Sequence, residues 1–258
     1  GATGPIGPTG PAGSIGVSGA FKNDYLRWDL AQGWVNQGSG AIALGQDSNA
    51  NPVGSGPSVV IGQNSGKSSA DRAIAIGSAA GETLQGIDAV AIGNAAGNVN
   101  QGRSSIAIGY NSGTTDAADN TVNVGKNAGH YNAGIGCVNI GAFTGSQSTT
   151  AQGVLQTNIG FLTGGGVGAG GDNKIAIGYE ANYNKVDNTD GIAIGSQSAW
   201  YQKREGIAIG KDTGNYQEIA SIAIGSEAAS ASGLAANYQR PNCIAIGVGA
   251  GKDSQGGG

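Results

Sequence analysis

The chain has 258 residues, of which 51 are glycine, while only 5% are aromatic and 12% are charged. So few large side chains exclude an ordinary globular core and favour a repetitive architecture that is dense in turns. The formal net charge of -4, the dispersed Lys and Arg residues and the lack of any long apolar run predict no nucleic-acid partner and no membrane insertion.

Glycine occupies every third position from Gly1 to Gly19, and Pro5, Pro8 and Pro11 each follow a glycine. This is the Gly-X-Y period of collagen, in which only glycine fits where three chains meet at the axis. A flexible linker rich in Gly and Pro would not need an unbroken period of three. Residues 1–20 therefore predict a short collagen-like triple helix and, with it, a homotrimer.

Residues 21–40 contain aromatic and large apolar side chains that are scarce elsewhere, including Phe21, Trp28 and Trp34. We interpret this segment as a cap or transition, because the open end of a repetitive β structure has to be covered. A sugar-binding patch is the alternative.

Thirteen copies of a short motif, typified by SIAIG, fill residues 41–251 and are followed by a Gly-rich tail at 252–258. Successive motif glycines lie 15 to 22 residues apart, most often 16. A period this short is typical of β-solenoids. We therefore predict an all-β fold, a parallel β-roll or β-solenoid with about 16 residues per coil. The motif glycines are Gly45, Gly62, Gly77, Gly93, Gly109, Gly125, Gly141, Gly160, Gly178, Gly195, Gly210, Gly225 and Gly247.

Two positions of the motif, such as Ile222 and Ile224, flank a small middle residue and are aliphatic in 25 of 26 instances. Side chains alternate between the two faces of a strand, so both flanking residues point the same way. We expect them to point into the coil and to stack into an aliphatic ladder. The residue three places after each motif glycine is Ala, Ser or Thr, which predicts a second short strand that ends in a tight turn.

The middle residue of the motif is Ala in nine copies, but it is Asn123, Asn139 and Asn158 in three consecutive copies. A small residue on the outer face would let three coils pack closely around a common axis. The three Asn would then form axial polar rings that fix the register or hold an ion or water. The alternative is that the Ala residues simply face solvent.

The recurring pattern [IV]-A-I-G-x-x-[AST] resembles the head repeats of trimeric autotransporter adhesins of the YadA type, over residues 41–251. That resemblance implies left-handed parallel β-rolls, three chains to a head, and adhesion to host surfaces. The Gly-X-Y segment is similar instead to fibres of phages and large viruses, and neither a heptad stalk nor a C-terminal anchoring barrel is evident in the sequence. We therefore expect a virion fibre or spike segment, located on the virion surface, that serves surface display and host attachment. A bacterial adhesin head on the cell surface is the alternative.

The stretch I-G-x-x-[AST]-x is also similar to the hexapeptide of left-handed β-helix acyltransferases, which are trimers as well. In that family His130, the only histidine, would be a candidate general base. That family's hexapeptides run contiguously, whereas this chain has one per coil, so we expect no enzyme. No catalytic residue, cofactor or metal site is predicted.

Aromatic side chains in the C-terminal half are the candidates for binding a host cell-surface glycan or protein receptor, because their faces stack against sugars and anchor protein partners. Packing between coil edges is an equally good explanation of these residues. Cys137 and Cys243 lie six coils apart, about 30 Å at the strand spacing, so we expect free thiols. The aromatic candidates are Tyr179, Tyr183, Trp200, Tyr201, Tyr216 and Tyr238.

Overall fold

The structure, a computed structural model, describes eight segments of the chain: residues 26–29, 33–36, 42–48, 56–146, 153–164, 172–183, 189–230 and 239–252. The predicted collagen-like segment at 1–20 lies outside these residues, as does the tail after Lys252, so both remain predictions. Within the segment predicted as a cap, β1 (Leu26–Asp29) and β2 (Gly33–Asn36) pair as an antiparallel hairpin.

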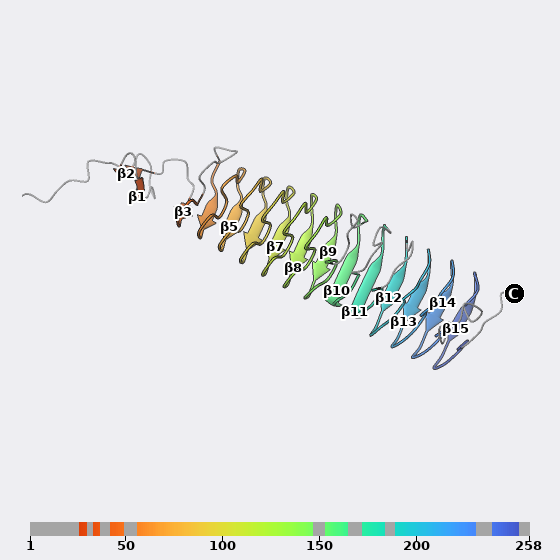
Figure 1. Ribbon diagram of the computed structural model, residues 1–258. Helices are drawn as coiled ribbons and strands as arrows, with labels where there is room; N and C mark the ends of the chain where they lie inside the picture. Colours follow the sequence, from red (N-terminus) through yellow and green to blue (C-terminus); the bar gives the residue numbers. More distant parts are fainter. Residues whose placement is uncertain are drawn as a thin grey trace, which may run out of the picture.

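A parallel β-solenoid forms the rest of the described chain (Figure 1). Its sheet has thirteen strands in chain order, and neighbouring strands are paired residue for residue, as in Ala91 with Ala107. The predicted all-β solenoid with about 16 residues per coil is confirmed. The strands are β3 (Ile42–Leu44), β4 (Val59–Ile61), β5 (Ile74–Ile76), β6 (Val90–Ile92), β7 (Ile106–Ile108), β8 (Val122–Val124), β9 (Val138–Ile140), β10 (Thr157–Phe161), β11 (Ile175–Tyr179), β12 (Ile192–Ile194), β13 (Ile207–Ile209), β14 (Ile222–Ile224) and β15 (Ile244–Ile246).

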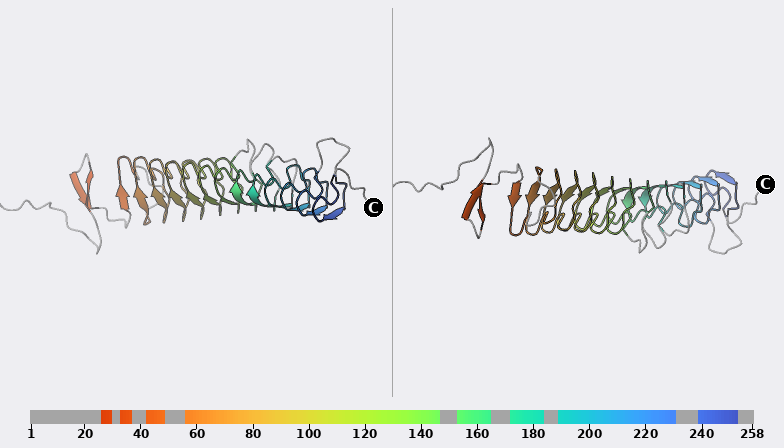
Figure 2. Two further views of the ribbon diagram at one scale, coloured as in Figure 1. Left: turned by 90° about the horizontal axis from the view of Figure 1, so that it is seen from below. Right: turned by 90° about the horizontal axis from the view of Figure 1, so that it is seen from above.

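The strands occupy one side of the rod, and turns make up the other side (Figure 2). The predicted second strand is wrong, because the residue three places after the motif glycine lies in a turn in every described coil except at Thr213, which belongs to no strand either. Its hydroxyl often closes that turn, as where Ser65 Oγ donates to the Gly62 carbonyl at 2.9 Å. On that side the pairing is reduced to isolated bridges, such as Thr83 with Val99.

Most strands end just before their motif glycine, and β10 and β11 end one residue after it, where consecutive glycines are packed against one another. Gly109 has a φ of 127°, and a Cβ built there would lie 2.6 Å from the carbonyl oxygen of Gly125 in the next coil. No side chain fits in that space, and this backbone conformation is rarely open to residues other than glycine. The column of glycines therefore lets neighbouring coils approach closely at the point where the chain turns into the next side of the coil.

The side chains point in the direction opposite to the one predicted. The middle residues Ala75 and Ala91 are fully buried, whereas Ile76 and Ile92 are only half-buried and Ile108 is 37% exposed. The expectation that the aliphatic pair fills the coil is therefore wrong. The interior of the coil is lined mainly by Ala, Ser and Thr, with Val60 as a fully buried aliphatic middle residue, and most of the Ile and Val side chains form the outer face of the sheet.

Carboxamide side chains fill the space that remains inside the coil. The large buried side chain of Gln85 is followed in the next strand by a small middle residue, Ala91, and that of Gln101 is followed by Ala107. Two coils further on the arrangement is reversed: small Ala117 and Ala133 precede the buried amides of Asn123 and Asn139. In these four coils a large amide is thus always combined with a small Ala, as close packing requires. The fully buried amides are Gln85, Gln101, Asn123, Asn139, Gln156, Asn158, Asn182, Gln202, Gln217 and Gln239.

Five of the buried Gln side chains, those of Gln85, Gln101, Gln202, Gln217 and Gln239, brace their coils through backbone carbonyl groups. Gln101 Nε2 donates to the carbonyl oxygen of Val90 at 2.9 Å and to that of Ser105 at 3.2 Å. Gln217 Nε2 likewise donates to the Ile207 carbonyl at 3.0 Å. These bonds tie the inner wall of one coil to the strand beside it and satisfy the buried amide donors, whereas the Oε1 atoms of Gln85 and Gln101 have no hydrogen-bond partner.

Candidate assembly face and attachment residues

Three Asn residues, predicted as axial rings of a trimer, form a ladder inside the coil. Asn139 Nδ2 donates to Asn123 Oδ1 at 2.8 Å, and Asn158 Nδ2 donates to Asn139 Oδ1 at 2.9 Å. All three side chains are fully buried within one chain. The expected ring at a surface shared by three chains is therefore wrong, because the middle residue of the motif points inward and its amide pairs along the rod.

The flanking aliphatic residues instead create a long apolar face on the outside of the sheet. None of the 26 flanking side chains of β3 to β15 is buried. Exposure is 37% for Ile108, 52% for Leu44 and 66% for Ile246. Because the strands are in register from one coil to the next, these side chains form two straight parallel rows along the rod. We call these two rows the aliphatic face.

A row of aromatic side chains lies immediately beyond the aliphatic face, at or next to the position that follows the motif glycine. Phe161 and Tyr179 end β10 and β11, and their rings stack with centroids 5.9 Å apart and planes at 3°. Phe143 meets Phe161 edge to face at 5.8 Å. Lys126 Nζ lies 6.0 Å from the ring centroid of Tyr110 and 5.7 Å from that of Phe143. The row therefore runs over five successive coils, a surface that sequence reasoning found only at Tyr179.

The predicted receptor-binding aromatics do not form one site. Tyr179 belongs to the aromatic row and is 48% exposed. The rings of Tyr201 and Tyr216, which lie in two later neighbouring coils, stack with their centroids 4.9 Å apart. Tyr183 and Trp200 are half-buried, and the Trp200 backbone N–H donates to Asn215 Oδ1 at 3.2 Å. These contacts fit packing between coils as well as binding. The sixth candidate, Tyr238, lies outside the described residues.

His130 and the two cysteines are partly or fully buried. His130 is half-buried with its ring 4.0 Å from that of Tyr131, and burial lowers its pKa. Cys137 and Cys243 are buried free thiols, as predicted. Burial also raises the pKa of Cys137, whose Sγ lies 3.0 Å from the Gly153 carbonyl oxygen. Among the described residues, no group of three His, Cys, Asp or Glu side chains is placed to hold a metal ion.

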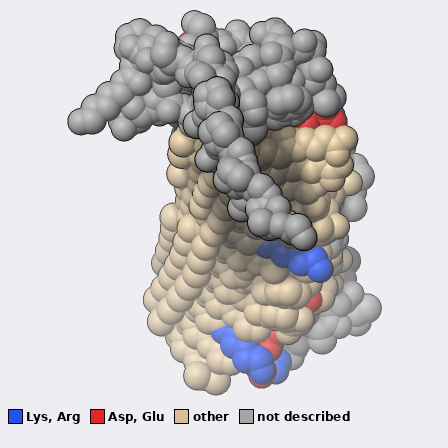
Figure 3. Space-filling model, turned by 90° about the vertical axis from the view of Figure 1, so that its left-hand side faces the viewer, with Lys and Arg blue, Asp and Glu red and all other residues tan. Residues whose placement is uncertain are grey.

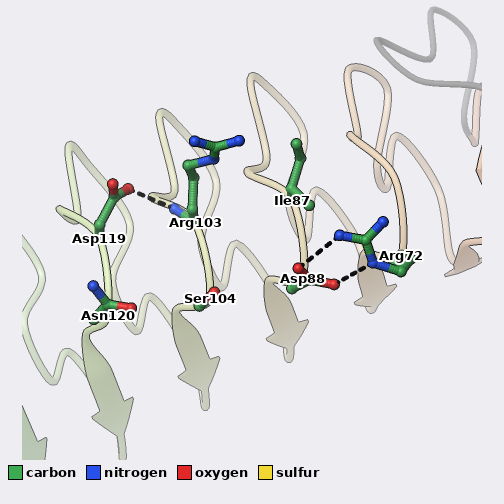
Figure 4. A pocket seen from close by; sticks show the side chains of 7 residues that line it. All are labelled: Arg72, Ile87, Asp88, Arg103, Ser104, Asp119 and Asn120. Carbon is green, nitrogen blue, oxygen red and sulfur yellow. Dashed lines mark hydrogen bonds and ion pairs between the residues drawn. The ribbon is translucent and has the colours of Figure 1, made fainter.

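Charged side chains are sparse on the face shown in Figure 3. One open groove of about 340 Å³ is lined by charged and polar side chains at the corners that precede β5 to β8 (Figure 4). The guanidinium of Arg72 pairs with the carboxylate of Asp88, at 2.6 Å and 2.8 Å, and keeps the pKa of Asp88 below its usual value. The lining residues are Arg72, Ile87, Asp88, Arg103, Ser104, Asp119 and Asn120.

Comparisons of the chain with models of protein families, with curated proteins and with solved structures found no match. Over the part of the chain that the structure describes, no helix has the length and apolar character needed to cross a membrane. The candidate functional surfaces therefore have to be judged on their own chemistry. They are the aliphatic face, the aromatic row and the groove.

Proposed function

We propose that this chain is a segment of a homotrimeric fibre or spike on a virion, which displays the fibre at the surface and attaches it to a host. The observation that carries the proposal is the aliphatic face, because a rod that exposes two rows of mostly Ile and Val, interrupted only at Thr157, needs a partner to cover them. The partner is two further copies of the same chain.

The size of the aliphatic face supports this role. Twelve steps at the strand spacing of about 4.8 Å, and a width of about 10 Å for two rows, give a footprint of roughly 600 Å². The largest apolar patch on a typical monomer is about 300–600 Å², and such patches commonly mark an interaction site. A face that is straight, apolar and repeated at every coil matches an equally long and regular partner, which a second copy in parallel register provides.

The Gly-X-Y pattern of residues 1–20 supports the number three, since a collagen helix requires three chains. Three rods that start from one triple helix would be parallel and in register. Their aliphatic faces would then meet at a common axis, with branched side chains packed into an apolar core between the chains. The outer sides of the rods, with their turns and corners, would stay accessible to a receptor.

Attachment is supported by the aromatic row and the paired tyrosines. Tyr110 and Tyr179 are about half exposed on a rigid scaffold, an arrangement that suits stacking against sugar rings or anchoring a protein. A bacterial adhesin head would use the same assembly and the same surfaces. Only the larger protein to which the segment belongs distinguishes the two locations.

The assembly is tested by the substitution Ile108→Lys, with Ile219→Lys as the matched control. Ile108 belongs to the aliphatic face and is 37% exposed, while Ile219 is 44% exposed at a corner outside the strands. Burying one lysine charge per chain in the trimer core would weaken assembly, since an unpaired charge in an apolar site costs several kcal/mol. We expect light scattering to show dissociation of the Ile108 variant only. Equal masses for both variants at every concentration would contradict the proposal.

A further inference from the structure

We propose that the groove beside Arg103 binds an acidic sugar residue, one that carries a carboxylate or a sulfate ester next to free hydroxyl groups. This site rests on the proposed attachment function, because it names the chemical class of the receptor. The groove lies at the corners of neighbouring coils, on a different element of the coil from the strands that form the aliphatic face.

The backbone fixes the side chains that line the groove. Arg72, Asp88, Ser104 and Asn120 occupy the same corner of four successive coils, with φ values of 57°, 59°, 53° and 60°. Each corner is stacked on the next by backbone hydrogen bonds, for example from the Asn120 N–H to the Arg103 carbonyl at 2.9 Å. The corners therefore repeat at the coil spacing of about 4.8 Å and present a preformed row of polar groups. The volume of about 340 Å³ lies within the range of small-molecule sites.

Most of the charged groups in the groove are already paired, and one is not. Arg72 is held by Asp88, and Asp119 Oδ1 accepts a hydrogen bond from the Arg103 backbone N–H at 2.7 Å. The guanidinium of Arg103 is exposed and has no hydrogen bond or ion pair with any residue that the structure describes. Figure 4 shows it pointing outward above the groove. Its five N–H donors are thus open to a ligand.

The unpaired guanidinium favours an anionic group on the ligand. Its planar set of donors matches the two oxygens of a carboxylate or of a sulfate, and such paired bonds are stronger than bonds to neutral acceptors. The two guanidinium groups and two carboxylates that line the groove cancel in formal charge, so an anion meets no local excess of negative charge.

Hydroxyl groups on the same ligand have matching partners within the groove. The second oxygen of Asp119 can accept from a hydroxyl, while the Asn120 amide and the Ser104 hydroxyl can both donate and accept. The side chain of Ile87 supplies an apolar patch for the face of a sugar ring. An acidic sugar carries all three features in one residue, whereas a simple anion carries only the first.

The test is a titration of the full chain with 3′-sialyllactose, with a sulfated lactose and with lactose, followed by ligand-observed NMR. For such an open site we expect dissociation constants on the order of 1 mM for one or both acidic sugars, and no saturation by lactose up to about 20 mM. Affinity should fall as salt is added, because the charge contact is solvent-exposed. Whether the carboxylate or the sulfate sugar binds more tightly identifies the source of the anionic group.

Variants locate the site. We expect Arg103→Gln to weaken the binding of acidic sugars about tenfold or more, and Arg103→Lys to have an intermediate effect, because lysine keeps the charge but loses the planar pair of donors. Arg204→Gln is the matched control, since Arg204 is exposed at the equivalent position of a later coil and does not line the groove. It should leave the affinity unchanged.

Equal binding of lactose, failure of both acidic sugars to bind, or unchanged affinity of the Arg103→Gln variant would each overturn the site. The outcome is independent of the assembly test, because sugar binding is measured whatever the mass of the particle. If the chain is a trimer but binds no acidic sugar at Arg103, only this inference is overturned. If a single chain binds the acidic sugar, only the proposed assembly is overturned.

Discussion

The substitution Asn139→Ala removes the central rung of the buried Asn ladder. It breaks the bond from Asn139 Nδ2 to Asn123 Oδ1 at 2.8 Å and the bond from Asn158 Nδ2 to Asn139 Oδ1 at 2.9 Å. The lost bonds leave one acceptor and one donor in the interior of a fully buried ladder. Each buried group without a partner costs about 1–3 kcal/mol, so the sum is about 2–6 kcal/mol before relaxation. Because a water molecule could enter the vacated space and bond to both groups, we expect a loss of about 2–3 kcal/mol.

The matched control is Asn98→Ala, which also removes two hydrogen bonds between coils. Asn98 Nδ2 donates to the Ala79 carbonyl at 2.9 Å and to Glu82 Oε2 at 3.1 Å, but this amide is partly exposed. Water can replace its bonds, so we expect a loss of about 1 kcal/mol or less. Unfolding in urea, followed by circular dichroism, gives both free energies. If Asn139→Ala costs no more than Asn98→Ala, the buried amides do not stabilise the coil in the way described.

Two further predictions concern the glycine column and the groove. Gly109→Ala should prevent folding or lower the free energy of unfolding by more than about 3 kcal/mol, because its Cβ would lie 2.6 Å from a backbone oxygen. Gly249→Ala should lower it by only about 1 kcal/mol, because no atom lies within 4 Å of the added Cβ. Similar urea midpoints for the two variants would contradict the tight approach of the coils. Arg72 lowers the pKa of Asp88, so the stabilisation from this pair is present above the unfolded pKa of about 3.9 and is lost as the pH falls through the lower folded pKa. Carboxyl NMR titration should show a rise in the pKa of Asp88 in Arg72→Gln and a smaller rise in Arg103→Gln, whose charge is a minor cause of the shift. An unchanged pKa in Arg72→Gln would show that the pair is not formed in solution.

The position of each strand could be predicted from the sequence, because the motif marks it directly. The structure places β14 at Ile222–Ile224 and β7 at Ile106–Ile108, where the motif repeats require them. A short period with branched aliphatic residues and a glycine leaves few folds other than a stacked coil. The parallel register follows as well, since every copy of the motif has the same order of residues.

The direction of the side chains could not be derived from alternation alone. Alternation shows that Ile222 and Ile224 share a face, but it does not show which face is inside. The usual preference for burying the larger apolar residues gave the wrong answer, because the interior of most coils is filled by Ala together with amide side chains, as at Ala107 and Gln101. One signal that was missed is the set of small residues at the other inward positions. A second is the pairing of one large with one small inward residue in each of two coils: Gln101 precedes Ala107, whereas Ala117 precedes Asn123.

The groove could not be predicted because it depends on residues that are distant in sequence and on unusual corners. Asp88 and Asn120 have left-handed φ values although neither is glycine, and no local pattern marks that conformation. The pairing of Arg72 with Asp88 likewise depends on the 16-residue register between coils. Once the coil length is known, residues 16 apart become neighbours, and such ladders of side chains can be found by aligning the repeats.

The most direct test of the account is the mass of the unmodified chain in solution, measured by light scattering over a range of concentrations. One chain has a mass of 25.1 kDa, so three chains covering one another's aliphatic faces give a particle of about 75 kDa. We expect the larger particle to persist on dilution to micromolar concentrations. A particle of 25.1 kDa at every concentration would show that the rows of Ile and Val face water and that the proposed trimer is wrong.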